Sequence, residues 1–324
     1  MTPFVSASLV GGLSLLLLLV AAELFVWVST RLAQIWRISP LITSLIIVAL
    51  GTNVPEFAVS IGSIVRNDPG LALGNLIGSS VTNLSLIFGV SILFGLIKPG
   101  TVKTQINAWM LLSITLLFTS MSLLHLGHKL QALYLLAAML AVVSYQFLLG
   151  IRGRRKEDKA SLRRVKSKKL GPLGITKYVF LLIIAIALVW IGGNQVVASL
   201  TVFSTELGIS TTVLGLTLAG IATTLPELLT TLTASFQHQN KVAIGTVLGS
   251  NIFNLTLFPA IVFGTVGTWY INPRIAAILL AVTLLFVGTL VQFRGRPIPR
   301  YFGLIFLSAY FCFLFVSTHF QTNL

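Results

Sequence analysis

Two short stretches of the sequence place a proline beside a glutamate within long apolar runs. The first reads TNVPEFA at residues 52–58, and the second reads TTLPELL at residues 223–229. An ionised side chain is costly inside a membrane. Proline also leaves the backbone carbonyl four residues earlier without its helical hydrogen bond, and hydrocarbon offers that oxygen no partner. Each stretch therefore presents a carboxylate and a backbone oxygen that a cation could bind.

A second polar motif follows each Pro-Glu pair at the same distance. The two copies read GNLIGSSVTN and GTVLGSNIFN, and they end at Asn83 and Asn254. A helix places Ser79 on the face of Asn83, four residues on, and Ser250 on the face of Asn254. The glycines at the first and fifth positions predict close helix packing. One such motif is typical of polar contacts between helices, but its repetition in register with Pro-Glu favours a shared site.

All the candidate ligands are hard oxygen donors, which select Ca²⁺, Na⁺ or Mg²⁺ over zinc or copper. Ca²⁺ accepts six to eight irregular ligands, whereas Mg²⁺ demands a tight octahedron, so Ca²⁺ fits better. Two carboxylates neutralise one Ca²⁺, and without a cation or a proton between them they would repel each other. The donors in the motifs are Thr52, Asn53, Glu56, Ser79, Asn83, Thr223, Thr224, Glu227, Ser250 and Asn254.

The composition places these motifs in a membrane. Of the 324 residues, 56% are hydrophobic and only 9% are charged, against about a quarter charged in soluble domains. The net charge of +15 could indicate nucleic-acid binding, but ten of the 22 Lys and Arg fall within residues 152–169. The positive-inside rule explains that cluster as a cytoplasmic loop. We therefore expect the lipid bilayer as a partner and no nucleic acid.

Ten apolar runs are long enough to cross a bilayer, which takes ~20 residues. If the 152–169 loop lies inside, 19 of the 22 basic residues fall on the inner side and 3 on the outer side. This bias predicts that both termini lie outside. No nucleophile–base pair or phosphate loop is present, so we expect neither an enzyme nor a cofactor. The predicted spans are 8–30, 38–65, 70–97, 105–124, 130–150, 176–200, 210–236, 241–266, 274–293 and 300–318.

The sequence contains an internal repeat. When Pro55 is aligned with Pro226, the halves align without a gap, and Glu56 falls on Glu227. Five spans in each half mean that the second half enters the membrane from the opposite side, as in many secondary transporters. The expected fold is an all-α membrane protein with ten transmembrane helices in two inverted five-helix repeats. These are residues 1–151 and 173–324, joined by a basic cytoplasmic loop at 152–172.

The repeats resemble the α-repeats of the cation/Ca²⁺ antiporter superfamily, most closely its sodium/calcium exchanger branch of compact prokaryotic type. The family pattern, roughly G-T-S-x-P-E and then G-N-x-x-G-S-N-x-x-N, matches residues 38–90 and 209–261. The resemblance implies that Na⁺ and Ca²⁺ compete for overlapping sites and that the first and sixth helices slide to alternate access. It implies a prokaryotic plasma membrane and central acids Glu56 and Glu227. The other implied ligands are Thr52, Thr223, Ser79, Ser250, Asn83, Asn254 and the backbone carbonyls near Ala49 and Gly220.

Several positions depart from the family pattern. Asn53 replaces a small serine, and Asn254 stands where some exchangers carry an aspartate. Two carboxylates offset less positive charge than a site with a third acid would, which argues against a stoichiometry of three Na⁺. The proton-coupled plant and fungal branch ends its G-N-x-x-E motif in a glutamate that is absent here, which favours Na⁺ as the counter-ion. The other departures are Ser80, Ala222 and Thr246.

The sequence leaves alternatives open. The first keeps exchange but changes the ions, to H⁺/Ca²⁺ or another monovalent/divalent pair; the others are a cation channel and a non-transporting membrane protein. Glu23 falls on Asn194 in the repeat. Glu23 is either an acid of the cation pathway or a group that packs between helices or reaches a water-filled face. A monomer is the simplest expectation for the oligomeric state.

Overall fold

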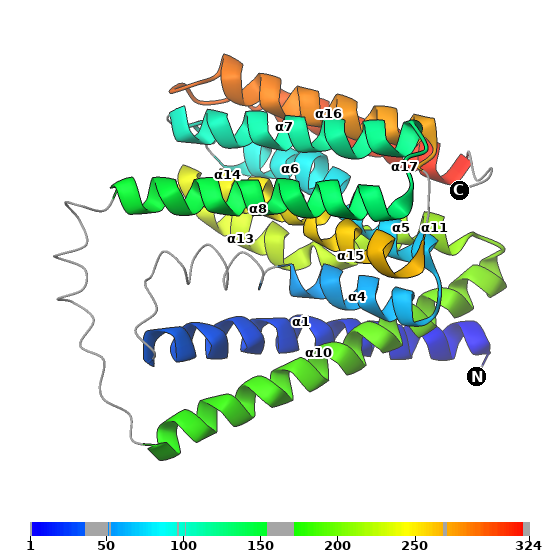
Figure 1. Cartoon of the computed structure of the whole chain (residues 1–324). Coiled ribbons are helices and arrows are strands. Elements are labelled where there is room, and N and C mark those ends of the chain that lie inside the picture. The colour runs from blue at the N-terminus through cyan, green and yellow to red at the C-terminus, as the bar shows by residue number, and fades with distance from the viewer. Residues whose placement is uncertain are drawn as a thin grey trace.

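The computed structural model describes residues 2–35, 51, 53–95, 97–100, 102–153, 172–267 and 271–319. All regular secondary structure in these residues is helical (Figure 1). Helix α1 begins and helix α17 finishes at one end of the molecule, whereas α8 finishes and α10 begins at the opposite end (Figure 1). The described ends of the chain therefore lie on one side, as an even number of crossings requires.

The first half of the chain forms seven helical elements in its described residues. They are α1 (Pro3–Ile35), α4 (Val54–Val65), α5 (Pro69–Thr82), the π-helical turn η2 (Asn83–Ile87), α6 (Phe88–Phe94), α7 (Val102–Leu123) and α8 (His128–Gly153). The second half forms α10 (Pro172–Leu207), α11 (Thr211–Leu214), the π-helical turn η3 (Gly215–Ala219), α12 (Gly220–Thr223), α13 (Leu225–Phe236), α14 (Asn240–Leu255), α15 (Leu257–Val266), α16 (Pro273–Gln292) and α17 (Tyr301–His319).

The internal repeat is visible in the helix boundaries. Helices α4 and α13 begin and end at positions that the repeat aligns with each other. Helices α5 and α14 also begin at aligned positions. Both α4 and α13 are followed by a non-glycine residue in the left-handed region, Asn67 with φ 55° and His238 with φ 56°. Local stop signals at equivalent positions thus give both halves the same short helix and the same turn.

Nine of the ten predicted spans are found in the described residues. Eight described helices or continuous helix pairs are long and apolar enough to cross a membrane, and the pair 211–223 and 225–236 makes a ninth, bent by 45°. The tenth predicted span, 38–65, lies outside the described residues except for residue 51 and residues 53–65, which include α4. The predicted fold class is confirmed. The first and sixth spans extend further than predicted, from 3 to 35 and from 172 to 207.

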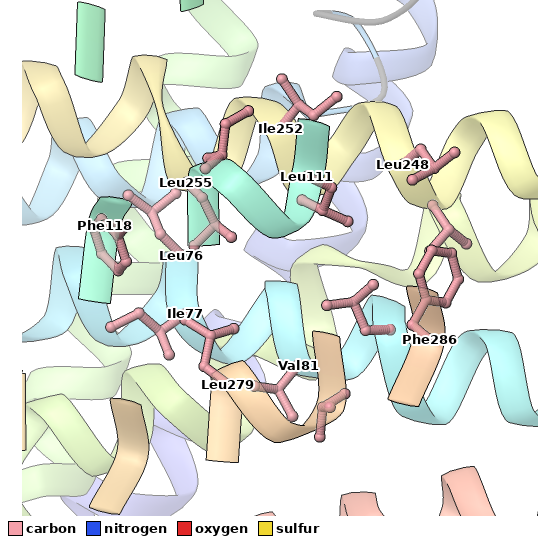
Figure 2. Close-up of a cluster of buried hydrophobic side chains, with 14 of the residues drawn as sticks. Leu76, Ile77, Val81, Leu111, Phe118, Leu248, Ile252, Leu255, Leu279 and Phe286 are labelled. Carbon is pink, nitrogen blue, oxygen red and sulfur yellow. The ribbon is translucent and has the colours of Figure 1, made fainter. Parts of the chain in front are cut away.

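The main core packs the motif helices against α7 and α16. Figure 2 shows a cluster of buried apolar side chains from these helices. The labelled members are Leu76, Ile77 and Val81 of α5, Leu111 and Phe118 of α7, Leu248, Ile252 and Leu255 of α14, and Leu279 and Phe286 of α16. This apolar packing holds α14 against α7 and α5 against α16. Helices α5 and α14 carry the second motifs.

Helices α1 and α10 form a separate antiparallel pair along one side of the molecule (Figure 1). Glycines allow the two helices to pack closely. A Cβ atom added at Gly11 would lie about 3 Å from Ser199, and one added at Gly192 would lie about 3 Å from Leu18. In their most apolar segments only 22% and 11% of residues are buried. The pair is thus mostly exposed to the membrane and contacts the rest of the protein mainly through α4.

Basic side chains divide between the two ends of the molecule as the predicted topology requires. At the end where α1 begins lie Arg66, Lys129 and Arg274. At the opposite end lie Lys98, Lys177, Lys241, Arg294, Arg296 and Arg300. Which membrane side each end faces stays a prediction.

Candidate cation-binding site

Both glutamates of the Pro-Glu motifs occupy the first turn of a helix that begins at a break. Glu56 lies in α4 and Glu227 in α13, and both side chains are fully buried. Each proline lies in the first turn of its helix. Its missing N–H has no helical partner to lose there, so a new helix can begin at the proline. In the second repeat the chain bends by 45° between α12 and α13, at Thr224.

Asn75 connects the two repeats through a buried hydrogen-bond network. Its amide nitrogen donates to the Glu56 carbonyl at 3.2 Å and lies 3.5 Å from the Ser60 hydroxyl. The Thr223 hydroxyl lies 3.2 Å from the Asn75 carbonyl oxygen and 3.2 Å from the Ser79 hydroxyl. Since all five residues are buried, the network holds the first-repeat motifs against α12 of the second repeat.

The second-repeat motifs meet in the same way. The Ser250 hydroxyl of α14 donates to the Glu227 carboxylate at 3.2 Å. The Thr224 hydroxyl donates to the carbonyl of Gly220 at 2.9 Å, so this predicted backbone ligand already has one partner. Asn254 lies one turn after Ser250 on α14 and is fully buried. The Ser250 contact therefore joins α14 to the carboxylate of the second Pro-Glu stretch.

Several buried oxygen and nitrogen atoms of the site have no hydrogen-bond partner among the described residues. They are both carboxylate oxygens of Glu56, one carboxylate oxygen of Glu227, and both amide atoms of Asn83 and of Asn254. A buried polar atom without a partner is destabilising, and a buried charge more so. The oxygens among these atoms fit a cation, because carboxylate and amide oxygens are ligands that hard cations such as Ca²⁺ accept. The Asn75 network would hold the helices around it.

Hydrogen bonds connect Glu56, Ser79 and Thr223 through Asn75, and they connect Glu227 with Ser250. Two predicted site residues lie outside the described residues. Thr52 and Ala49 belong to that undescribed part of the chain. The other predicted residues are all buried, namely Asn53, Glu56, Ser79, Asn83, Gly220, Thr223, Thr224, Glu227, Ser250 and Asn254. In the described part of the chain, no three His, Cys, Asp or Glu side chains gather into a metal site. Two carboxylates therefore supply all of the acidic charge in the described part of the candidate site.

The glycines of the first motif allow the two repeats to cross at close range. A Cβ on Gly78 would meet the Leu216 carbonyl, and one on Gly220 would lie 2.7 Å from the Gly78 carbonyl carbon. The predicted close approach is confirmed for this motif. No described atom lies within 4 Å of a Cβ on Gly245 or Gly249. The segment that the repeat would place against them, 41–45, lies outside the described residues.

Asn75 is the site residue that the sequence analysis overlooked. It lies four residues before Ser79 on α5 and eight before Asn83, the first residue of η2, a spacing that puts all three on one face of a regular helix. This regular spacing was the available signal. The internal repeat gave no support to Asn75, because the residue aligned with Asn75 in the second repeat is Thr246. The Thr246 hydroxyl donates to the Val242 carbonyl of its own helix.

We expect Asn75→Leu to weaken the apparent affinity for transported cations by roughly tenfold. Leucine removes the donor to the Glu56 carbonyl and the acceptor for Thr223, and a lost buried hydrogen bond costs about 1–3 kcal/mol, or roughly tenfold per 1.4 kcal/mol. The measurement is the cation concentration at half-maximal flux in vesicles. Asn107→Leu is the control, because Asn107 accepts from Gln146 at 2.8 Å on other helices. Equal affinities of the two variants would contradict the role of Asn75.

Glu23 and Asn194 do not join the buried cluster. Glu23 is exposed on α1, whereas Asn194 on α10 is half-buried. The side chain of Asn194 accepts from the Arg66 guanidinium at 3.2 Å. The two repeat-related positions therefore have different surroundings.

An all-helical membrane protein with inverted repeats and carboxylates buried at helix breaks belongs to the class of secondary cation transporters. Within that class, the chain belongs to the sodium/calcium exchanger protein family, whose model matches residues 7–152 and 177–319. The assignment rests on nearly the whole chain, with both repeats included.

Known proteins similar to this chain include transporters and solved structures. Inner membrane protein YrbG of Escherichia coli (strain K12) is 29% identical over 304 residues, which cover 91% of this chain and 90% of that protein. Sodium/calcium exchanger MaX1 of Methanosarcina acetivorans is 27% identical over 348 residues, covering 94% and 96%. A structure of the sodium-calcium exchanger NCX_Mj superposes with a TM-score of 0.64 at 25% identity, covering 96% of this chain and 97% of that one.

Proposed function

We propose that this protein is an antiporter that exchanges Ca²⁺ for Na⁺ across the membrane around the Glu56 and Glu227 carboxylates. Ca²⁺ binds when both acids are ionised, and two or more Na⁺ displace it. The observation that carries the proposal is the set of buried carboxylate oxygens without partners among the described residues. The names of MaX1 and NCX_Mj, both called sodium/calcium exchangers, support the choice of ions.

The proposed ligands divide between the repeats. Ser79, Asn83 and Glu56 come from the first repeat, and Thr223 with Glu227 from the second. The proposed set is completed by Thr52, Asn53, Ala49, Gly220, Thr224, Ser250 and Asn254. In this arrangement no single repeat holds the cation, so movement of one repeat against the other changes the coordination. That coupling is what an exchanger needs between ion binding and access.

The burial of the site bears on the transport cycle. Glu56, Glu227 and Asn83 have no exposed surface, so the arrangement supports an occluded state between two open ones. The α1–α10 pair, which contacts the rest mainly through α4, is the element proposed to slide. Because Glu56 lies in the first turn of α4, movement of the pair is transmitted to one of the two proposed acids.

We infer the orientation from the charge distribution. The end with Lys98, Lys241 and Arg294 faces the cytoplasm, and both termini lie outside. The units are two repeats, 1–151 and 173–324, joined by a cytoplasmic loop at 152–172. An inner membrane location is supported by the name of the relative YrbG.

Flux into vesicles decides between counter-ions. We expect liposomes that contain the purified protein to take up labelled Ca²⁺ when an outward Na⁺ gradient is imposed. An outward H⁺ gradient of equal size should drive at least about tenfold less Ca²⁺ uptake. The physical reason is that Na⁺ binds the same hard oxygens as Ca²⁺. Uptake driven by the pH gradient alone would favour H⁺/Ca²⁺ exchange. Single-channel current that does not depend on the counter-ion would favour a channel.

A further inference from the structure

Three connections between helices meet around one cavity at the end of the molecule where α8 finishes and α10 begins (Figure 1). They join α6 to α7, α13 to α14, and α16 to α17. The cavity has a volume of about 890 Å³, within the range of sites that bind small molecules, roughly 300–1,000 Å³. It lies away from the buried carboxylates, and the proposed exchange does not use it.

Four basic residues border the cavity, whose lining surface is otherwise mostly apolar. Lys98, Lys241 and Arg294 contribute permanent positive charges, and His238 contributes an imidazole ring. No acidic residue is among the described residues that line the cavity. The four side chains are exposed and able to reach a ligand. Ammonium groups act as point charges toward phosphate, and a guanidinium binds phosphate oxygens in pairs. The cavity therefore suits a phosphate-bearing anion.

Hydrogen bonds between the connections fix the positions of these basic residues. The backbone N–H of Lys98 donates to the Asn240 side chain at 2.9 Å, and the N–H of Gly295 donates to the Pro99 carbonyl at 3.0 Å. Asn240 in turn donates to the His238 carbonyl at 3.3 Å. The cavity is thus a built arrangement of three connections, unlike basic side chains scattered over a surface.

The setting of the cavity favours a lipid over a soluble anion. Three large apolar side chains are exposed within four residues of its basic groups: Phe94 before Lys98, Phe236 before His238, and Val291 before Arg294. Phe94 is 64% exposed. An acyl chain can cover these side chains while its headgroup enters the cavity. Basic pockets between membrane helices on the cytoplasmic side are known to bind anionic headgroups in this way.

We propose that this cavity binds the phosphate headgroup of an anionic phospholipid and ties the three connections together. One of them is the turn between α13 and α14, the helices that carry Glu227 and Ser250. A lipid bound here stabilises the second-repeat part of the proposed site from outside it. The proposal rests on the cavity alone, so its failure would leave the cation site unaffected, and the reverse also holds.

The test is thermal unfolding of purified protein in detergent with added lipid, a measurement that involves no transport. We expect phosphatidylglycerol in about hundredfold excess over its Kd to raise Tm by roughly 5 °C, and phosphatidylcholine to leave Tm unchanged. The triple variant Lys98→Gln, Lys241→Gln, Arg294→Gln should lose this rise. The control Lys177→Gln, Arg296→Gln, Arg300→Gln removes equal charge at the same end outside the cavity lining and should keep it.

Three results would overturn the proposal. The first is an equal rise of Tm with both lipids for the unmodified protein. The second is a rise with inorganic phosphate but none with phosphatidylglycerol, which would make the ligand a soluble anion. The third is a full rise in the triple variant or, if that variant does not fold, in the single variant Lys241→Gln, which should lose at least half of it.

Discussion

Replacing Glu227 by glutamine is expected to lower Na⁺-driven Ca²⁺ uptake at least about 100-fold. Glutamine keeps the shape of the side chain and its contact with Ser250, which lies 3.2 Å from the carboxylate, but it removes one of the two charges of the proposed cation site. Loss of one charge from a buried interacting pair costs about 3–5 kcal/mol, and each 1.4 kcal/mol is tenfold. The measurement is uptake of labelled Ca²⁺ into vesicles that contain equal amounts of inserted protein.

Glu56→Gln is expected to give the same loss, because both carboxylates are fully buried in the cluster. The matched control is Glu206→Gln, which removes the same charge at an exposed position near the end of α10. It should transport like the unmodified protein. If Glu56→Gln or Glu227→Gln kept full flux, that residue would have no part in the cation site.

Replacing Gly78 by alanine is expected to lower Tm by roughly 5–10 °C. The added Cβ would lie 2.7 Å from the Leu216 carbonyl carbon. Because the neighbour is backbone, no side-chain rotation relieves the overlap, and α5 must move away from η3. Overpacking of this kind costs about 1–3 kcal/mol or more, and each kcal/mol corresponds to roughly 2–4 °C in a large domain. The same displacement would separate Ser79 from Thr223 and weaken cation binding.

Gly288→Ala is the control for Gly78→Ala. Both glycines lie inside helices, but a Cβ on Gly288 would meet no described atom within 4 Å. Alanine also favours helix over glycine by about 1 kcal/mol, so Tm should stay the same or rise slightly. Equal Tm values for the two variants would mean that the crossing of α5 with η3 does not depend on Gly78.

Much of the fold follows from local signals in the sequence. Apolar runs of about 20 residues require helices in a membrane, because hydrocarbon leaves no other partner for the backbone. The gapless alignment of the two halves through their Pro-Glu motifs predicted that both share one structure, and α4 and α13 have matching bounds. Helix ends were less predictable: α1 and α10 continue well past their predicted limits.

The candidate site was only partly predictable. The motifs identified Glu56, Glu227 and their hydroxyl neighbours, because such residues are costly in a membrane without a partner. Asn75 escaped detection, since its contacts to Glu56 and Thr223 cross 19 and 148 positions of the chain. The π-helical turns η2 and η3 left no pattern in the sequence that distinguished them from ordinary helix.

The sequence by itself determined the class of protein and its repeats and singled out two candidate acids, because these depend on residue type and on spacing along the chain. Only the tertiary structure decided which oxygen atoms meet. It brought α5 against η3 and α12 through Gly78 and Gly220, and it gathered the basic residues of three connections around one cavity. Such contacts depend on how helices cross, and a crossing is set by the packing of both surfaces. The hydrophobic periodicity of one helix alone does not specify how that helix crosses another.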